Sequence, residues 1–346
     1  MKYRVVASLL TLLLGALGVM APACGGGEEG AMSYGPAQVH LPNDEGSHPT
    51  ALVEWWYLNS NLEDAEGREY TAMVAYFRPT LKIISISDVQ AETFYHEVPS
   101  SWELSHAHPA YAEGHLDLRW NDSDHWYRTG EDDLSYRLEA SGRDIGLALD
   151  ITSQKSPLMV GGDGLMEWAQ GNTYYYSLTR LAVEGQITLE DKTIDVEGIG
   201  WMDHQWMDSM AEAGWDWFSV QLDDDTELIF WQIINSVGSV TSMDLTMMFP
   251  DESIYHTDQL ELEKLETWVS PDTGKEYGVT WRVSEERQDL DLKITARYPA
   301  QEILLFHDQP DYAWQFWEGG TTVSGRLKGK SVSGVGYAEL VPMRKW

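Results

Sequence analysis

Two titratable residues, Asp203 and His204, lie side by side between tryptophans in residues 201–206 (WMDHQW). A carboxyl group placed among apolar rings must be paired, exposed or functional, because an unpaired buried charge is costly. Burial also raises the pKa of a carboxyl group, which lets it keep a proton and donate it to a substrate. We therefore take Asp203 and His204 as candidate catalytic residues, with a purely structural role for the pair as the alternative.

Aromatic residues are abundant, with 16 Trp and 17 Tyr among 346 residues. They cluster in segments that also hold polar residues, namely 54–57 (EWWY), 201–206, 214–218 (GWDWF) and 316–320 (FWEGG). In a β-strand alternate side chains share a face, which would place Asp203 on one face and His204 with Trp206 on the other. A β-barrel lined by such rings forms a deep apolar pocket with a few polar groups, the usual site for a lipophilic molecule. For any single ring, the alternative is an ordinary place in the core.

The elements that would position these residues are β-strands. Strand-forming runs recur between turn signals, at a spacing close to the about 8–12 residues expected of sandwiches and barrels. They are residues 53–58, 70–77, 114–120, 145–152, 174–183, 215–222, 227–234, 290–298 and 321–327. Only residues 258–267 have a helical pattern. The sequence therefore predicts an all-β fold.

A faint internal repeat divides the chain. Its first copy is WWYL at 55–58 and NL at 61–62, followed by a polar turn and a long apolar strand. Its second copy is WDWF at 215–218 and QL at 221–222, again followed by a polar turn and an apolar strand. The offset is 160 residues in both parts. We interpret the repeat as two barrel-like domains, over residues 39–204 and 205–346.

The first residues have the pattern of an export signal. Lys2 and Arg4 precede an apolar run, and small residues then lead to Cys24, the only cysteine of the chain. This is the order of a signal peptide, and the position of the cysteine suits a bacterial lipobox. We predict a signal peptide over residues 1–23, lipidation of Cys24 and a flexible tether over residues 24–38. The alternative is an ordinary secretory signal cut near Ala23.

The predicted location is the cell envelope, with the lipid of Cys24 as membrane anchor. Gly25 provides no aspartate retention signal, which favours the outer membrane if the host has one. No second apolar run approaches the ~20 residues of a transmembrane helix. The formal net charge of −33 would repel phosphate groups, so nucleic acid is not expected as a partner.

Six separated segments together resemble the carotenoid 1,2-hydratase and AttH-like family. They are residues 54–57, 175–181 (YYSLTRL), 200–206, 214–218, 317–319 and 334–340 (GVGYAEL). The resemblance covers nearly all of the chain from about His40 onward, in the same order. It implies a pair of lipocalin-like antiparallel β-barrel domains. The named activities of the family include addition of water to an isoprenoid double bond, and fungal relatives hydrate a prenylated flavonoid. The resemblance therefore narrows the class of ligand more than it fixes the reaction. If the chain hydrates an alkene by proton donation from a carboxylic acid, no cofactor is expected.

The resemblance and the aromatic pattern together give a set of candidate ligand-binding residues around the domain junction. They are Glu54, Trp55, Trp56, Tyr57, Tyr176, Arg180, Trp201, Trp206, Trp215, Trp217, Trp231, Trp317 and Glu318. The expected ligand is a hydrophobic small molecule, terpenoid or lipid-like. No metal is expected, because the histidines at 106, 108 and 115 have no further ligand at fixed spacing and are better explained as a surface loop.

One departure from the family leaves the function open. The carotenoid hydratases carry a Tyr-x-Asp whose aspartate is the proposed proton donor, and this chain offers Trp231-Gln232-Ile233 there. Either Asp203 or Asp216 supplies the proton, and the chain is a hydro-lyase, or the chain does not hydrate. In the second case we expect a carrier or chaperone for a lipophilic molecule, serving an envelope transporter.

Overall fold

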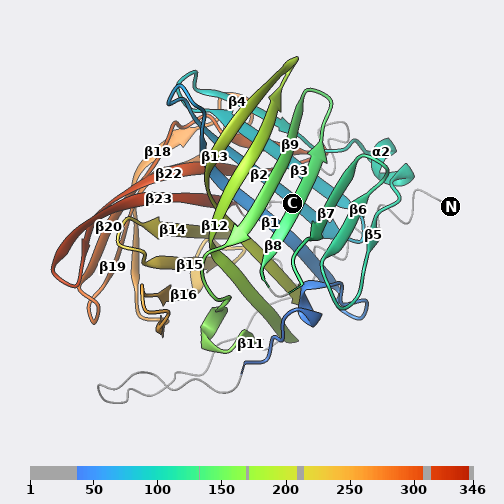
Figure 1. Cartoon of the computed structure of the whole chain (residues 1–346). Coiled ribbons are helices and arrows are strands. Elements are labelled where there is room, and N and C mark those ends of the chain that lie inside the picture. The colour runs from blue at the N-terminus through green and yellow to red at the C-terminus, as the bar shows by residue number, and fades with distance from the viewer. Residues whose placement is uncertain (1–36, 132, 169–170, 209–213, 307–312, 343–346) are drawn as a thin grey trace.

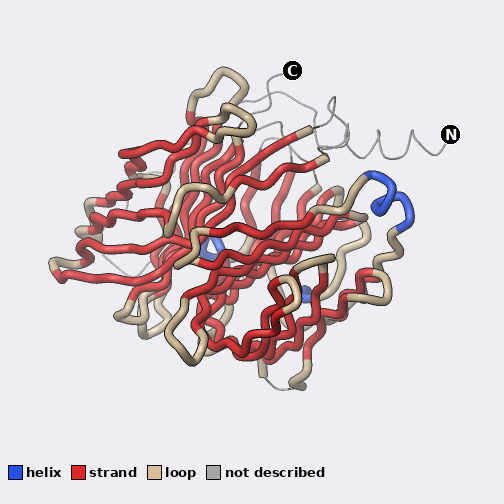
Figure 2. Tube along the Cα trace, turned by 90° about the horizontal axis from the view of Figure 1, so that it is seen from above, coloured by secondary structure: helices blue, strands red, loops and turns tan. Residues whose placement is uncertain are grey.

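The computed structural model describes residues 37–131, 133–168, 171–208, 214–306 and 313–342. The predicted signal peptide, Cys24 and most of the predicted tether lie outside the described residues. Strands are the main secondary structure of the described chain, and helix is confined to short segments (Figure 2). The all-β prediction is therefore confirmed. No described helix is long and apolar enough to cross a membrane.

The first half of the chain forms one antiparallel sheet of 13 strands (Figure 1). Its neighbouring strands, in spatial order, are β4 (Thr93–Glu97), β3 (Leu81–Asp88), β2 (Glu69–Arg78), β1 (Val53–Glu63), β13 (Lys192–Met207), β12 (Gly171–Leu189), β9 (Ile145–Ser153), β8 (Ser135–Ser141), β7 (Asp124–Arg128), β6 (Asp117–Trp120) and β5 (Ala110–Tyr111). Two short strands, β10 (Leu158–Met159) and β11 (Leu165–Trp168), pair with β12. The helical segments are η1 (Asn43–Glu45), α2 (Ser101–His106) and η2 (Val160–Gly162).

The second half forms a separate antiparallel sheet of 10 strands. Its spatial order is β17 (Ile254–Thr257), β16 (Val240–Met248), β15 (Glu227–Ile234), β14 (Gly214–Leu222), β23 (Lys330–Val341), β22 (Trp314–Leu327), β20 (Leu290–Ala296), β19 (Glu276–Glu285) and β18 (Glu261–Val269), with β21 (Glu302–Leu305) paired to β22. Strand β13 of the first sheet ends at Met207, and strand β14 of the second sheet begins at Gly214.

The helix predicted over residues 258–267 is wrong, because most of this segment belongs to strand β18. Glu, Lys and Leu favour a helix intrinsically, but pairing with β19 overrides that preference. β18 is the edge strand of its sheet and most of its side chains are exposed, so residues typical of a helix surface are tolerated there.

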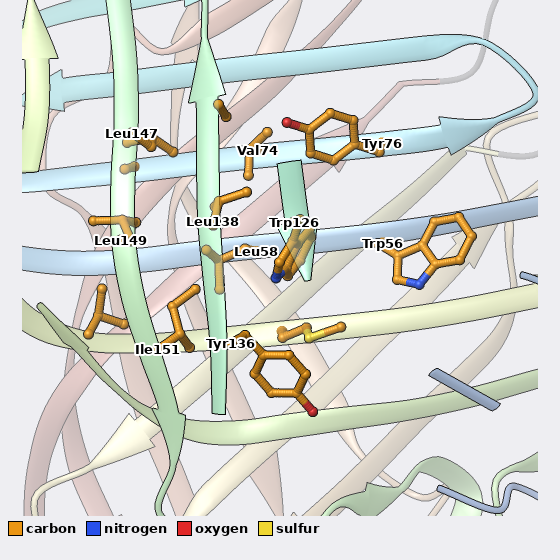
Figure 3. Packing of buried hydrophobic residues seen from close by; sticks show 14 of the residues in the cluster. Trp56, Leu58, Val74, Tyr76, Trp126, Tyr136, Leu138, Leu147, Leu149 and Ile151 are labelled. Atoms are coloured by element: carbon orange, nitrogen blue, oxygen red, sulfur yellow. The ribbon is translucent and has the colours of Figure 1, made fainter. Parts of the chain in front are cut away.

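Apolar side chains form three clusters rather than two. The first sheet encloses one cluster, which includes Trp56, Leu58, Trp126 and Leu138 (Figure 3). The second sheet encloses another, which includes Phe218 and Trp281. The third cluster lies where the two sheets meet and takes residues from both, and we call it the junction cluster. Its buried members are Tyr57, Met73, Ala75, Ile83, Leu158, Val160, Tyr175, Trp201, Trp217, Ile229, Trp231, Met248, Ile303, Leu305, Phe316, Tyr337 and Val341.

Candidate functional site

The two candidate catalytic residues, Asp203 and His204, point to opposite faces of strand β13. His204 lies on the face that packs into the first core, together with Trp206. Asp203 lies on the opposite face with Trp201, in the junction cluster. Successive side chains of a strand point to opposite faces, so the two residues cannot serve one site through direct contact. The structure therefore contains two polar centres, one on each side of β13.

The junction centre contains Asp203, which is 3% exposed. Its carboxylate accepts hydrogen bonds from Tyr175 Oη at 2.5 Å, Ser177 Oγ at 2.6 Å and Trp201 Nε1 at 2.6 Å. Trp217 Nε1, from the second sheet, donates to Tyr175 Oη at 3.1 Å. Burial raises the pKa of Asp203 to about 6, although the three donors oppose the rise. Both carboxylate oxygens thus act as hydrogen-bond acceptors.

Two glutamates, Glu318 and Glu339, form the other half of the junction centre. They are directly opposite each other on the paired strands β22 and β23. Trp215 Nε1 donates to Glu339 Oε1 at 2.8 Å, and Tyr57 Oη donates to Glu318 Oε2 at 3.2 Å. The two carboxyl groups are also hydrogen-bonded to each other, which requires a proton on one of them.

The electrostatics of these glutamates favour the protonated form. Burial raises the pKa of Glu318 well above its usual range, and the charge of Glu339 adds to the shift. Burial also raises the pKa of Glu339, to about 7, against the hydrogen bonds from Trp215 and Glu318. Among the described residues, no Lys, Arg or His contributes to the electrostatics of Asp203, Glu318 or Glu339. Within the part of the chain that the structure describes, the junction therefore holds three carboxyl groups without a basic partner.

Partly exposed aromatic rings lie at the edge of the junction cluster. Trp55, Trp215 and Trp314 are each partly buried and pack against the junction cluster. The ring centroids of Trp215 and Trp314 are 6.3 Å apart in an edge-to-face arrangement, and Trp55 lies 6.0 Å from Phe77. We call Trp55, Trp215 and Trp314 the aromatic rim. Glu339 is partly buried and bonded to one of the rim residues, so it is the carboxyl group nearest the rim.

The second centre lies on the other face of β13, around the fully buried Glu54. Its carboxylate meets Arg78 Nε at 2.9 Å, His48 Nδ1 at 2.8 Å and His204 Nε2 at 3.2 Å. Burial would raise the pKa of Glu54, but the bonds from His204 and His48 outweigh it and hold the pKa at about 2. The ring of His204 stacks on Trp56 at 4.6 Å. Burial lowers the pKa of His204, against the opposing effect of Glu54.

His48, Glu54 and His204 have the residue types of a metal site, with donor atoms within 4.8 Å of one another. In the present geometry both imidazoles bond to the same oxygen, Glu54 Oε1. Arg78 already supplies a positive charge to the other oxygen. Glu54 is thus held by hydrogen bonds with Arg78, His48 and His204.

The remaining predicted residues lie apart from the junction carboxyl groups. Arg180 pairs with Glu227 at 2.5 Å and so links the two sheets. Tyr176 meets His204 edge-on in the first core, whereas Trp317 is buried in the second core. Asp216 lies on the opposite face of β14 from Trp217 and accepts a bond from Gln232 at 2.6 Å. Burial raises the pKa of Asp216.

Sequence reasoning missed several residues of both centres. Glu339 was inside the recognised segment 334–340, but nothing in the sequence showed that it lies opposite Glu318. Tyr175 was likewise inside segment 175–181 without an assigned role. His48 and Arg78 carried no signal, because they reach Glu54 from separate parts of the chain.

The fold and its buried junction define a two-domain, lipocalin-like β protein. The chain belongs to the AttH-like family, whose model matches residues 33–342. A search among curated proteins gave no match.

Solved structures that resemble the chain include the following three. An AttH protein from Nitrosomonas europaea has a TM-score of 0.76 and 26% identity, covering 91% of this chain and 100% of its own. Kievitone hydratase from Nectria haematococca has a TM-score of 0.69 and 17% identity, covering 89% and 96%. CghA with Sch210972 has a TM-score of 0.53 and 14% identity, covering 85% and 89%. At these identities, the last two similarities concern the fold alone.

Proposed function

We propose that this protein is a hydratase-like enzyme that adds water to a carbon–carbon double bond of a hydrophobic, terpenoid or lipid-like molecule. The reaction takes place at the junction of the two sheets and needs no cofactor. The observation that carries the proposal is the set of three carboxyl groups, Asp203, Glu318 and Glu339, held among aromatic rings with no basic partner among the described residues. Such an environment keeps a proton on a carboxyl group at neutral pH, as general acid catalysis requires.

The surroundings of the carboxyl groups suit the remaining steps. Protonation of an alkene gives a carbocation, and the faces of tryptophan and tyrosine rings attract positive charge. Trp215 and Trp217 lie on the junction side of β14, and Tyr57 and Trp55 lie on the junction side of β1. The ligand's apolar part would contact the aromatic rim. Hydration also agrees with the activity in the name of one structural neighbour, kievitone hydratase.

A carrier function is the second candidate, and one observation favours it. Trp231 and Ile233, in the segment that replaces the Tyr-x-Asp of the carotenoid hydratases, pack in the junction cluster, and Gln232 bonds to Asp216. The position of the family aspartate is thus apolar. A protein without a proton donor would bind the same class of ligand and release it unchanged, for example to an envelope transporter.

The experiment that separates the two functions uses isoprenoid alkenes in heavy water enriched in ¹⁸O. A hydratase incorporates one solvent deuterium on carbon and one ¹⁸O in the new hydroxyl group, which mass spectrometry of the extracted product detects. A carrier binds the alkene and returns it with neither label. Native mass spectrometry of protein purified from its own host would name the ligand class in either case.

We also propose that the mature protein begins at Cys24 and is anchored to the membrane of the cell envelope by its lipid. The basic start, the apolar run and the position of the only cysteine support this proposal. An envelope location would place the junction close to lipophilic molecules.

A further inference from the structure

Asp203 and Glu339 hold the same position in the two halves of the protein. Tyr57 of β1 is directly opposite Asp203 of β13, and Trp217 of β14 is directly opposite Glu339 of β23. Tyr57 and Trp217 are equivalent through the 160-residue offset of the repeat. The repeat thus brings one acid from each half to the junction.

The cross-strand neighbours of these two acids differ. Opposite Asp203 on β12 is Ser177, whose hydroxyl group donates a hydrogen bond to it. Opposite Glu339 on β22 is Glu318, a second carboxyl group. Asp203 is therefore surrounded by donors and accepts with both oxygens. Glu339 instead shares a hydrogen bond with another acid.

We propose that Glu318 and Glu339 share one proton and together donate it to the double bond of the substrate, with Glu339 as the catalytic residue at the aromatic rim. Proton donation by Glu339 to a substrate rests on the proposed hydratase function. The sharing of a proton between Glu318 and Glu339 does not depend on that function. Asp203 is then a positioning residue that holds Tyr175, because its oxygens are engaged by three donors.

A comparison with another buried glutamate supports the different roles of Asp203 and of the Glu318–Glu339 pair. Buried Glu285 accepts from Tyr255 Oη and from two backbone N–H groups, of Arg287 and Gln288. By contrast, Glu318 is 2% exposed and, among the described residues, receives one donor of this kind, Tyr57 Oη. Two ionised carboxylates this close cannot both persist in an apolar site, so the pair retains a proton.

The glutamate pair both supplies the proton that the alkene receives and recovers a proton from the added water. Glu339 transfers the proton to one alkene carbon, the π bond breaks, and the carbocation lies beside two carboxylates that stabilise it. Water adds to the cationic carbon, and one of its protons returns to the pair. The hydrogen bond between Glu318 and Glu339 lets the proton redistribute between them, so they titrate as a unit.

Infrared spectroscopy of the ligand-free protein tests the shared proton without any substrate. At about pH 8, above the usual range of glutamic acid, the wild type should show the carbonyl band of a protonated carboxyl group. Glu318→Gln should remove this band, and Glu339→Gln should shift it. The matched control is Glu285→Gln, which removes a buried glutamate of the same sheet and should leave the band unchanged. Absence of the band from the wild type overturns the proposal, whatever the variants do.

Turnover measurements test the catalytic part. If the wild type hydrates an alkene, Glu339→Gln should lower the rate by about 10²–10⁴-fold, with ligand affinity retained. Turnover at the wild-type rate in both glutamine variants overturns the catalytic role. If the band behaves as expected but the wild type converts no isoprenoid alkene, the hydratase function fails and the proton-sharing pair stands.

Discussion

Asn59 Nδ2 donates a hydrogen bond to Ser219 Oγ across 3.5 Å, and these residues occupy equivalent positions 160 residues apart in the repeat. Asn59 is on β1 and Ser219 is on β14, the matching strands of the two sheets. Equivalent residues meet in this way when two copies pack against each other by the same face. The junction is therefore built from one face of each copy, and the residues on these faces determine its chemistry.

Asp203→Asn is expected to lower the free energy of unfolding by about 1–3 kcal/mol. An amide group would turn a donor toward Tyr175, Ser177 or Trp201, all of which are donors to the carboxylate. Chemical denaturation followed by circular dichroism measures the change. The matched control is Asp195→Asn on the exposed part of the same strand, which should change stability by less than about 0.5 kcal/mol. Unchanged stability together with lost turnover would instead make Asp203 the proton donor.

The stability that Glu339 contributes should fall as the pH rises from about 4.5 to about 7. Its pKa is raised from 4.5 to about 7 in the folded protein, so in this range the folded state binds more protons than the unfolded state. Unfolding free energies measured across this range should therefore decrease with pH. In Glu339→Gln the slope should be smaller. An identical slope in both proteins would show that Glu339 is not protonated in the fold.

The Glu54 network should show the opposite sign. The pKa of Glu54 is lowered from 4.5 to about 2, so its contribution is present above pH 4.5 and is lost as the pH falls toward 2. Acid unfolding of the wild type, followed by fluorescence, should thus be steeper than that of Glu54→Gln, which should be less stable at neutral pH. Equal acid transitions would contradict the assigned network.

Arg180→Met should destabilise the protein by up to about 3 kcal/mol without changing ligand affinity. Glu227 is fully buried and, among the described residues, would keep Lys155, at 2.7 Å, as its one charged partner. Denaturation and ligand titration on the same variant measure both effects. Arg137→Met breaks an ion pair with the exposed Asp150 and should change stability by at most about 1 kcal/mol. A clearly weaker affinity in Arg180→Met would restore the ligand-binding role that the sequence suggested.

A polyene or retinoid probe should quench the tryptophan fluorescence of the protein, and Trp215→Leu should weaken binding by about 10-fold. Trp215 combines an exposed edge at the aromatic rim with a bond to Glu339. The control is Trp102→Leu, because Trp102 is 68% exposed on α2 and lies outside the junction cluster. Affinity should vary little with salt, since burial of apolar area drives binding. A steep fall with ionic strength would indicate a charged ligand.

Strand positions were predictable because period-two patterns and turn residues are local. The segments at 53–58, 215–222 and 227–234 all fall within strands. Residues 258–267 were predicted wrongly because a partner strand, not local propensity, decides the conformation of β18. A local sequence pattern does not show which distant segment will pair with a strand through backbone hydrogen bonds.

The candidate site was predictable only in part for the same reason. The aromatic segments drew attention to Asp203 and His204, yet their neighbours come from distant strands. Glu318 and Glu339 become a pair only through the register of β22 and β23. His204 acquires its partner Glu54 through contact across 150 residues of sequence.

The equivalence of Ser177 and Glu318 has a consequence for how such a protein can change. A chain with two copies of one framework can retain a satisfied carboxylate in the first copy and vary the same position in the second. The first copy then maintains the packing between the sheets, while substitutions in the second copy can introduce a carboxyl group that binds and donates a proton. Replacing a serine such as Ser177 by a glutamate such as Glu318 changes a single position. Because the architecture is duplicated, the effect of this replacement is confined to one half of the junction.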